Sequence, residues 1–216
     1  MSNDLFPIDV WSDVVCPFCY LGQRQLQVAL EDFEQRDLVV IRHHAFELDP
    51  NAKTHVGVKL SELVARKYSM PVERANALHD QLHAQGVELG IDLNFDAAVP
   101  TNTFDAHRLI ALGLTQGLAG PMCDRLFRSY FSDGELVSDH EVLCRLADEV
   151  GVTGASEMLQ SSAFTDEVRN DELAAQELGI SGVPSMVIDE KFMVVGAQGP
   201  EQILSVLRRA WARRSA

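Results

Sequence analysis

The sequence predicts an α/β fold, a four-stranded mixed sheet built from a β-α-β unit and a β-β-α unit with a large all-helical insertion between them. Strand patterns occur only near the two ends of the 216-residue chain. The long middle stretch instead repeats its hydrophobic residues at helical spacing. Because a β-α-β crossover is almost always right-handed and joins parallel strands, we expect the first two strands to pair in parallel.

The first unit occupies the first forty-odd residues. Residues 5–11 have the hydrophobic pattern of a buried strand, and residues 17–33 carry leucine, alanine and phenylalanine at helical spacing. Residues 38–46 then predict a second strand. The chain is therefore expected to pass from a strand, through a short loop, into a helix and back into the sheet.

The chain from about residue 50 to residue 178 is expected to be helical. Its hydrophobic residues recur every three or four positions in segments separated by Gly, Pro, Asn and Thr, namely 59–68, 71–87, 102–117, 119–132, 138–150, 155–162 and 165–178. Ser138 followed by Glu141 predicts a capping box at the start of one of these helices. We expect a discontinuous domain of residues 1–50 and 179–216, with residues 51–178 forming an inserted helical domain.

The strand pattern returns after Gly179. Residues 183–188 and 192–195 predict two strands joined by the polar turn Asp189-Glu190-Lys191, which indicates an antiparallel hairpin. A last helix follows from Gly199 through Trp211. Its arginines fall at the C-terminal end, where positive charge suits the helix dipole.

Charge and hydropathy limit the classes of function. The chain has 32 acidic and 18 basic residues and a formal net charge of −14, which argues against a nucleic-acid partner and against an anionic membrane surface. No segment approaches the roughly 18 apolar residues of a membrane span, and the first residues lack the pattern of a signal peptide. We therefore expect a cytoplasmic protein with no membrane or nucleic-acid partner, and the oligomeric state stays open.

The strongest chemical signal is Cys16-Pro17-Phe18-Cys19, where the first strand gives way to a helix. With Cys16 as the N-cap, Pro17 takes the first helical position, where its missing N–H costs nothing. Cys19 then lies one turn along, and an i, i+3 pair has Cβ atoms about 5–6 Å apart, so a modest closure joins the sulfurs. The Cys16 sulfur is expected to face the free N–H groups of Phe18 and Cys19, which favours a thiolate. Cys16 is therefore the predicted nucleophile.

Two cysteines at this spacing also match half of a zinc site, but such a site usually shows a second close pair. Cys123 and Cys144 are far apart in sequence and lie in hydrophobic rows, so both are expected to be small buried side chains. A second redox pair between them is the minority alternative. No metal is predicted. His43 and His44 should point to opposite faces of their strand, and no function is assigned to them.

Gly182-Val183-Pro184 opens the third strand, where a proline is unfavourable because it cannot donate to the ladder. Together with the CxxC motif and the β-α-β and β-β-α frame, this motif resembles the thioredoxin superfamily, in which a cis proline before the third strand packs against the CxxC. The helical insertion narrows the resemblance to DsbA-like proteins. Residues 13–22, 102–109 and 196–198 look like the FrnE-type branch of that family, and the resemblance spans essentially the whole chain.

The resemblance implies a thioredoxin fold and thiol–disulfide exchange. The Cys16 thiolate would attack a disulfide sulfur, a mixed disulfide would form, and Cys19 would resolve it. It also implies a cis Val183–Pro184 bond, with the Val183 backbone turned toward the sulfurs and available to hold an extended substrate.

Further site residues follow from the same resemblance. Pro17 and Phe18 offer no charge between the cysteines. Phe18, Tyr20 and Trp11 are candidates for lining an apolar groove beside the thiols, although core packing explains Trp11 equally well. The charge of Asp13 would oppose a thiolate. His107, on the helix beginning near Asn102, would face the site, either stabilising a thiolate or contacting substrate. A partly exposed histidine without a catalytic role is the simpler expectation.

The expected partners are protein or small-molecule disulfides and thiols, with glutathione as a candidate co-substrate and no other cofactor. An alternative on the same scaffold is a glutathione-dependent isomerase or transferase, similar to the hydroxychromene-carboxylate isomerases and kappa-class transferases. Those relatives typically carry serine where this chain has Cys16, so the retained cysteine pair favours redox chemistry. A third alternative is a non-catalytic chaperone or binding module, for which Cys16 would be dispensable.

Overall fold

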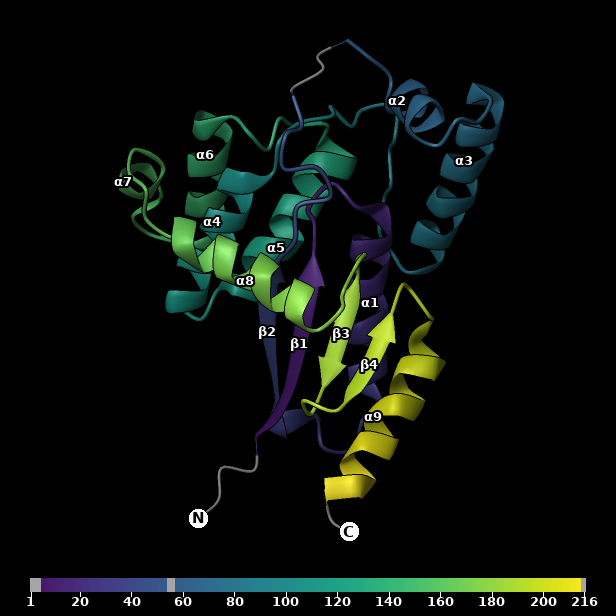
Figure 1. Ribbon diagram of the computed structural model, residues 1–216, viewed down its shortest axis with the longest axis vertical. Coiled ribbons are helices and arrows are strands. Elements are labelled where there is room, and N and C mark those ends of the chain that lie inside the picture. Colours follow the sequence, from purple (N-terminus) through teal and green to yellow (C-terminus); the bar gives the residue numbers. More distant parts are fainter. Residues whose placement is uncertain (1–4, 54–56, 215–216) are drawn as a thin grey trace.

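The computed structural model describes residues 5–53 and 57–214. Its sheet has four strands in the order β2-β1-β3-β4 (Figure 1). The strands are β1 (Phe6–Ser12), β2 (Val39–Ala45), β3 (Ser185–Ile188) and β4 (Phe192–Val195). β1 pairs in parallel with β2 and antiparallel with β3, and β3 pairs antiparallel with β4. The predicted α/β class and mixed sheet are confirmed.

The helices agree with the predicted segments to within a few residues. They are α1 (Pro17–Glu31), α2 (Leu60–Lys67), α3 (Val72–Glu88), α4 (Phe104–Thr115), α5 (Ala119–Arg128), α6 (His140–Val150), α7 (Ala155–Leu159), α8 (Thr165–Glu177) and α9 (Pro200–Arg214). The helices α2–α8 form the expected insertion between β2 and β3, while the division at residues 50 and 179 stays a prediction. In the described part of the chain, none of the helices is long and apolar enough to cross a bilayer.

The predicted capping box at α6 is wrong. The N-cap is Asp139, whose carboxylate accepts hydrogen bonds from the N–H groups of Glu141 and Val142. Ser138 is engaged elsewhere, since Thr101 Oγ1 donates to its Oγ at 2.5 Å. An aspartate is as good an N-cap as a serine, so the helix begins one residue later than predicted without a loss of stability.

The boundaries also differ at two other places. β3 begins at Ser185 rather than at residue 183, because a proline cannot join the hydrogen-bonded ladder. The helix predicted over residues 119–132 is α-helical only to Arg128, and a π-helical turn, Ser129–Asp133, continues it. Such turns are frequent at functional sites.

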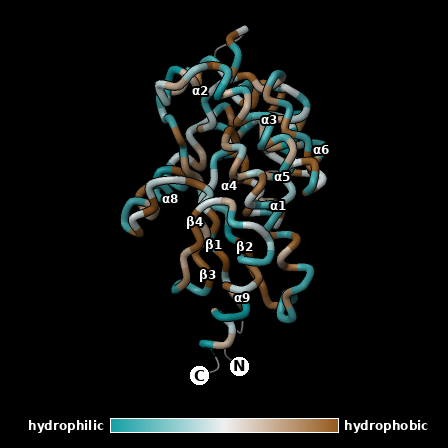
Figure 2. Tube along the Cα trace, turned by 90° about the vertical axis from the view of Figure 1, so that its right-hand side faces the viewer, coloured by the Kyte–Doolittle hydropathy of each residue, from teal (hydrophilic) through white to brown (hydrophobic). Residues whose placement is uncertain are grey.

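Alternation along β1 divides its side chains between two cores. Phe6, Ile8 and Val10 lie in a cluster with residues of α1 and α9 on one face of the sheet. Trp11 packs on the other face with Ala175 of α8. Figure 2 shows this hydrophobic strand running through the interior of the molecule. Because both faces of β1 are covered, the strand and the loop after it are held firmly.

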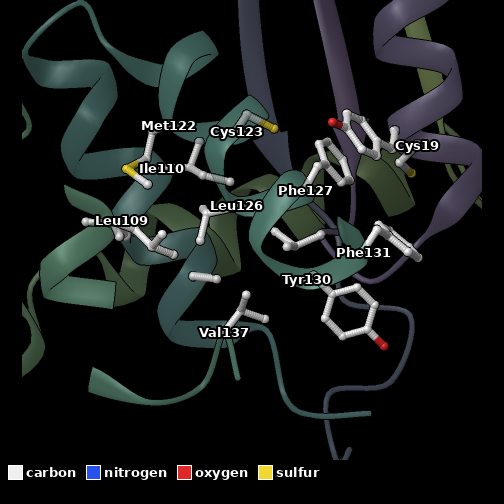
Figure 3. Close-up of a cluster of buried hydrophobic side chains, with 14 of the residues drawn as sticks. Cys19, Leu109, Ile110, Met122, Cys123, Leu126, Phe127, Tyr130, Phe131 and Val137 are labelled. Atoms are coloured by element: carbon white, nitrogen blue, oxygen red, sulfur yellow. The ribbon is translucent and has the colours of Figure 1, made fainter. Parts of the chain in front are cut away.

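The largest core belongs to the helical insertion and reaches the cysteines. It joins Cys16, Cys19 and Tyr20 to buried residues of α4, α5 and the turn that follows α5. The Tyr20 ring stacks on Phe127 with centroids 5.0 Å apart, and Figure 3 shows Cys19 at one end of this cluster. The start of α1 is therefore packed against both the sheet and the inserted helices.

Candidate active site

Both cysteines of the CxxC motif are reduced and buried at the start of α1. Cys16 is the N-cap, with φ −93° and ψ 113°, and Pro17 is the first helical residue. The Cys19 N–H donates to the Cys16 carbonyl at 3.0 Å. Cys16 is 4% exposed and Cys19 is 1% exposed. The predicted strand, loop and helix arrangement around the pair is confirmed.

The direction of the Cys16 thiol differs from the expectation. It makes no capping hydrogen bond to the helix and instead donates to the Val183 carbonyl, with Sγ 3.7 Å from the oxygen. The prediction that the sulfur faces the N–H groups of Phe18 and Cys19 is therefore wrong. A protonated thiol has a hydrogen to donate, and the Val183 carbonyl is an acceptor within its reach.

The loop that supplies this carbonyl is fixed from two sides. The Val183–Pro184 peptide bond is cis, as expected from the resemblance. Gly22 of α1 lies against the proline so closely that a Cβ atom there would be 2.9 Å from Pro184 Cγ. On the other side, the Gly196 N–H donates to the Pro184 carbonyl at 2.8 Å.

Gly22 is a site residue that the sequence analysis missed. Glycine in the interior of a helix costs about 1 kcal/mol relative to alanine, so its presence in α1 was a signal that another chain segment approaches closely.

The two cysteines have unequal surroundings. Burial raises the pKa of the Cys19 thiol well above its usual value, and the hydrogen bond and charge of Cys16 raise it further. Cys19 is therefore protonated at neutral pH as long as Cys16 has not formed a mixed disulfide. In a mixed disulfide Cys16 carries no charge, so one cause of the raised pKa of Cys19 is removed.

A cleft of about 770 Å³ opens beside Cys16. Pro17, Phe18 and Val183 line it, and Phe18 is 42% exposed at its edge. Tyr20 and Trp11, the other two residues considered for the groove, do not line the cleft and are buried in the hydrophobic cores. The sequence analysis did not foresee the opposite wall. This wall comes from α2, α3 and the segment before α4, with the apolar side chains Leu60, Leu63, Val64, Leu78, Leu82 and Phe95.

Two buried polar side chains beside the cysteines face each other without a hydrogen bond. Asp13 Oδ1 lies 3.4 Å from His107 Nε2, and neither atom has a hydrogen-bond partner among the described residues. The second carboxylate oxygen, Oδ2, accepts the Leu48 N–H at 2.8 Å. The Asp13 backbone carbonyl accepts the Cys16 N–H at 3.0 Å.

The simpler expectation for His107, a partly exposed histidine, is wrong. Its side chain is 2% exposed, because α4 turns this face toward the core. His107 is not among the residues that line the cleft. Most buried polar atoms in proteins are hydrogen-bonded, so the contact between Asp13 and His107 is unusual for a buried pair.

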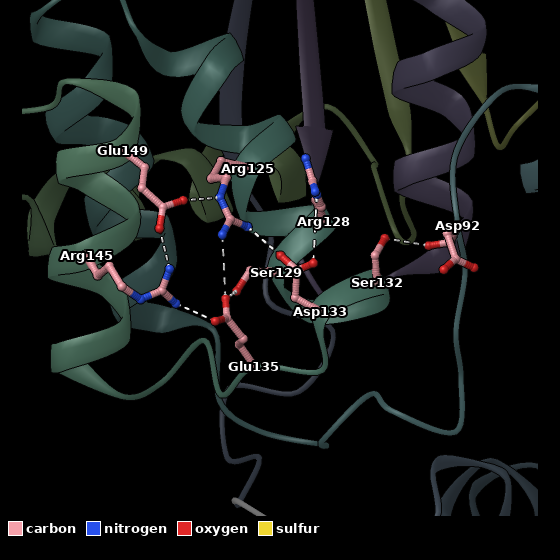
Figure 4. Close-up of polar contacts among 9 residues, drawn as sticks. All are labelled: Asp92, Arg125, Arg128, Ser129, Ser132, Asp133, Glu135, Arg145 and Glu149. Atoms are coloured by element: carbon pink, nitrogen blue, oxygen red, sulfur yellow. Dashed lines mark hydrogen bonds and ion pairs between the residues drawn. The ribbon is translucent and has the colours of Figure 1, made fainter.

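The π-helical turn Ser129–Asp133 brings Tyr130 to the cleft. Ion pairs hold this turn against α5 and α6 (Figure 4), with Arg125 Nη1 2.9 Å from Asp133 Oδ2 and Arg125 Nε 2.7 Å from Glu149 Oε2. Burial raises the pKa of Tyr130 above its usual value, so its hydroxyl stays protonated. Sequence patterns gave no signal for Tyr130, since it lay in a predicted regular helix.

The other two cysteines do not line the cleft. Cys123 is fully buried, as predicted. Cys144 is only half-buried, so its prediction as a buried side chain is wrong in degree. Among the described residues, no group of three or more His, Cys, Asp or Glu side chains is arranged to hold a metal ion.

Residues 7–208 match the family model described as DSBA-like thioredoxin domain. The chain belongs to this family. The predicted thioredoxin fold and DsbA-like relationship are therefore confirmed, while the FrnE-type branch stays a prediction.

Solved structures agree with the assignment. The chain is 34% identical to the probable DsbA oxidoreductase SCO1869 from Streptomyces coelicolor, with a TM-score of 0.91 over 96% of this chain and 90% of that one. It shares its fold with the cytosolic disulfide reductase DsbM from Pseudomonas aeruginosa with GSH, at 18% identity and a TM-score of 0.63 over 95% and 99% of the two chains. It also shares its fold with a 2-hydroxychromene-2-carboxylate isomerase, at 19% identity and a TM-score of 0.64 over 97% and 98%.

Proposed function

We propose that this protein is a dithiol–disulfide oxidoreductase that works through Cys16 and Cys19. The observation that carries the proposal is the direction of the Cys16 thiol. It points at the Val183 carbonyl, 3.7 Å away, next to the cis bond and on the wall of the cleft. A substrate in this cleft therefore meets Cys16 and the backbone of Val183 together.

The reaction is a two-electron exchange. The Cys16 thiolate attacks one sulfur of a substrate disulfide, forms a mixed disulfide with it and releases the other half as a thiolate, which takes up a proton. Cys19 then loses its proton and attacks Cys16 Sγ, releasing the first half of the substrate. The substrate disulfide becomes two thiols while Cys16 and Cys19 become a disulfide. The same steps in reverse oxidise a substrate dithiol.

The raised pKa of Cys19 gives this reaction its order. The raised pKa of Cys19 keeps it protonated while Cys16 attacks. In the mixed disulfide the charge of Cys16 no longer opposes Cys19, so the resolving step follows.

The other predicted residues support the two thiols in this proposal. Pro17 and Phe18 contact substrate at the wall of the cleft, and Val183 with Pro184 positions it beside Cys16. His107 acts through Asp13, because its buried ring does not reach the cleft.

The expected substrates are disulfides and thiols, including glutathione as co-substrate, and no other cofactor is invoked. A cytoplasmic location and the FrnE-type branch belong to this proposal. The location is supported by the description of the Pseudomonas neighbour as cytosolic.

A redox titration tests the proposal. The purified protein is equilibrated in glutathione buffers, quenched with acid, alkylated and analysed by mass spectrometry. We expect a reversible Cys16–Cys19 disulfide with a defined midpoint, lost in Cys16→Ser and unchanged in Cys144→Ser, which removes a half-buried thiol elsewhere. A protein that never forms this disulfide across the titration would overturn the proposal.

A glutathione-dependent isomerase or transferase is the second candidate. Its support is the cleft of about 770 Å³ next to Cys16, together with a fold shared with an isomerase. Equilibrium dialysis separates the two functions. Retention of glutathione without oxidation, equal in the wild type and in Cys16→Ser, would favour the isomerase or transferase and make Cys19 a structural residue.

A further inference from the structure

The wall of the cleft formed by α2 and the loop before it has an unusual charge for this protein. Between residues 50 and 70 there are four basic residues and one acidic residue, although the whole chain has a net charge of −14. Three of the chain's four lysines, Lys53, Lys59 and Lys67, lie in this segment. Positive charge is therefore concentrated on one side of the cleft.

Of the four basic residues in this segment, two form ion pairs with described residues and two do not. Lys59 Nζ lies 4.0 Å from an Asp96 carboxylate oxygen, and Arg66 lies 4.0 Å from Glu62. Lys53 and Lys67 line the cleft, and neither has an ion-pair partner within the described part of the chain. The Lys67 ammonium lies 5.9 Å from the centre of the Tyr68 ring. The two lysines that reach the cleft are thus the ones left without a carboxylate.

Neither carboxylate that lines the cleft forms an ion pair with Lys53 or Lys67 in the described part of the chain. Asp13 is 1% exposed and its Oδ2 is bonded to the Leu48 N–H. The carboxylate of Asp49 accepts the Asn51 N–H at 3.0 Å. His79 stacks on Phe95 with centroids 4.1 Å apart, and burial lowers its pKa, so it is neutral at pH 7.

The remaining lining is apolar, and the nucleophile is recessed. Leu63, Val64 and Leu82 form part of the wall opposite Cys16. Since Cys16 is only 4% exposed, a substrate sulfur has to enter the cleft to reach it. A slender molecule does this more readily than a disulfide held within a folded protein.

We propose that the cleft selects low-molecular-weight disulfides and thiols that have an apolar body and a carboxylate remote from the sulfur. Lys53 and Lys67 pair with the carboxylate while the apolar body contacts the leucines and valines of α2 and α3. The inference rests on the proposed function, because it names the substrate class for the same thiols.

The test uses matched aliphatic disulfides of different charge. Reduced protein is mixed with anionic dithiodipropionate, neutral hydroxyethyl disulfide or cationic cystamine, and the rate constant is obtained from the loss of protein thiols. The protein dithiol supplies both electrons, so no other reductant is needed. We expect Lys53→Gln combined with Lys67→Gln to lower the rate constant for dithiodipropionate about three- to tenfold, the effect of losing two exposed ion pairs. Hydroxyethyl disulfide should react at an unchanged rate and cystamine somewhat faster.

Lys59→Gln combined with Lys191→Gln is the matched control, because it removes the same charge from two lysines that do not line the cleft. We expect it to change none of the three rates by more than a small factor. The apolar part is tested with dithiodihexanoate, which has the same charge and longer chains. It should react about tenfold faster than dithiodipropionate in the wild type.

Different outcomes overturn different claims. Equal losses with all three disulfides, an equal effect of the control variant, or faster reaction with the disulfides of insulin than with any carboxylate disulfide would overturn the substrate class. Loss of protein thiols at an unchanged rate in Cys16→Ser would instead overturn the proposed function.

Discussion

Two clusters in this protein pair a carboxylate with a histidine. One is built on β1 and the other on the loop that follows it, and they differ in whether the facing atoms form hydrogen bonds. In the first, Asp9 of β1 and Asp171 of α8 hold His44 of β2 between them, with contacts of 2.8 and 2.6 Å. In the second, Asp13 and His107 lie 3.4 Å apart and the facing atoms make no hydrogen bond. The second cluster is the one beside the cysteines.

The His44 cluster is a structural brace. Its ring also stacks on Trp11, with centroids 4.4 Å apart. Burial alone would lower the pKa of His44, but hydrogen bonds and charge from Asp171 and Asp9 outweigh it and raise the pKa to about 9. The cluster therefore joins two strands and a helix with charged hydrogen bonds.

The comparison shows that two carboxylate–histidine contacts on one strand and its loop differ in their hydrogen bonds, since His44 has two short contacts and the facing atoms of Asp13 and His107 have none. Asp13 and His107 lie next to the CxxC pair, and their contact of 3.4 Å is longer than the two contacts that hold His44. We therefore expect substitutions in the His44 cluster to change the free energy of unfolding, and substitutions in the Asp13 cluster to change thiol–disulfide exchange.

The largest effect is expected from His44→Leu, which removes both charged hydrogen bonds and should lower the free energy of unfolding by about 3 kcal/mol near neutral pH. A histidine with a raised pKa contributes fully below its unfolded pKa of about 6.5, and the contribution is lost as the pH rises through about 9. Urea unfolding at acidic and alkaline pH measures this. A loss that is equal at both would contradict the role of the charge.

The neighbouring His43→Leu is the matched control. Burial lowers the pKa of His43 to about 4, and its Nδ1 has no hydrogen-bond partner among the described residues. Wild-type protein should lose stability as the pH falls from about 6.5 toward 4, and His43→Leu should not. At neutral pH the variant should be at least as stable as the wild type.

An intermediate effect is expected from Gly22→Ala, which tests whether the site around Cys16 depends on the close fit of α1 against Pro184. The new methyl group would meet Pro184 Cγ at 2.9 Å, and overpacking of this kind costs about 1–3 kcal/mol. We expect lower stability and slower thiol–disulfide exchange, because the Val183 carbonyl is displaced from Cys16. Thermal unfolding and the rate of disulfide reduction measure the two effects.

Gly120→Ala controls for the glycine substitution itself. It adds a methyl group to α5 whose nearest neighbour, His43 Nε2, is 3.6 Å away, an ordinary contact. This variant should be slightly more stable than the wild type, by about 0.4–1 kcal/mol. Equal behaviour of the two variants would show that the contact with Pro184 is unimportant.

The smallest effect is expected from Asp13→Asn. The amide oxygen can still accept the Leu48 N–H, so stability should change little. After burial and Cys16, Asp13 affects the pKa of Cys19 in two ways, since a hydrogen bond to its backbone lowers this pKa and its charge raises it. Asp13→Asn removes only the charge. Removing this charge favours the dithiol form, by about threefold in the equilibrium with glutathione, or about 15 mV.

Asp49→Asn serves as the control for the same measurement, because this carboxylate lies at the cleft but is exposed to solvent. It should shift the redox equilibrium less than Asp13→Asn does. A shift of Asp13→Asn toward the disulfide would contradict the proposed effect of the buried charge.

Much of this site was predictable because its signals are local. Cys16 as N-cap and Pro17 at the first helical position depend on residues within one helical turn. The Val183–Pro184 motif was found through its combination with the CxxC pair. The cap of α6 was missed by one residue, since Ser138 and Asp139 are both good caps and only a distant partner, Thr101, decided between them.

The sequence by itself determined the order of strands and helices and the position of the CxxC pair, because periodicity and capping act over a few residues, and the resemblance to a family pointed to Pro184. Tertiary structure decided the rest. It turned the Cys16 thiol toward a carbonyl 167 residues away, buried His107 against Asp13, fitted Gly22 against Pro184 and placed α2 and α3 over the cleft. These features depend on which distant surfaces pack together, and no local pattern encodes that choice.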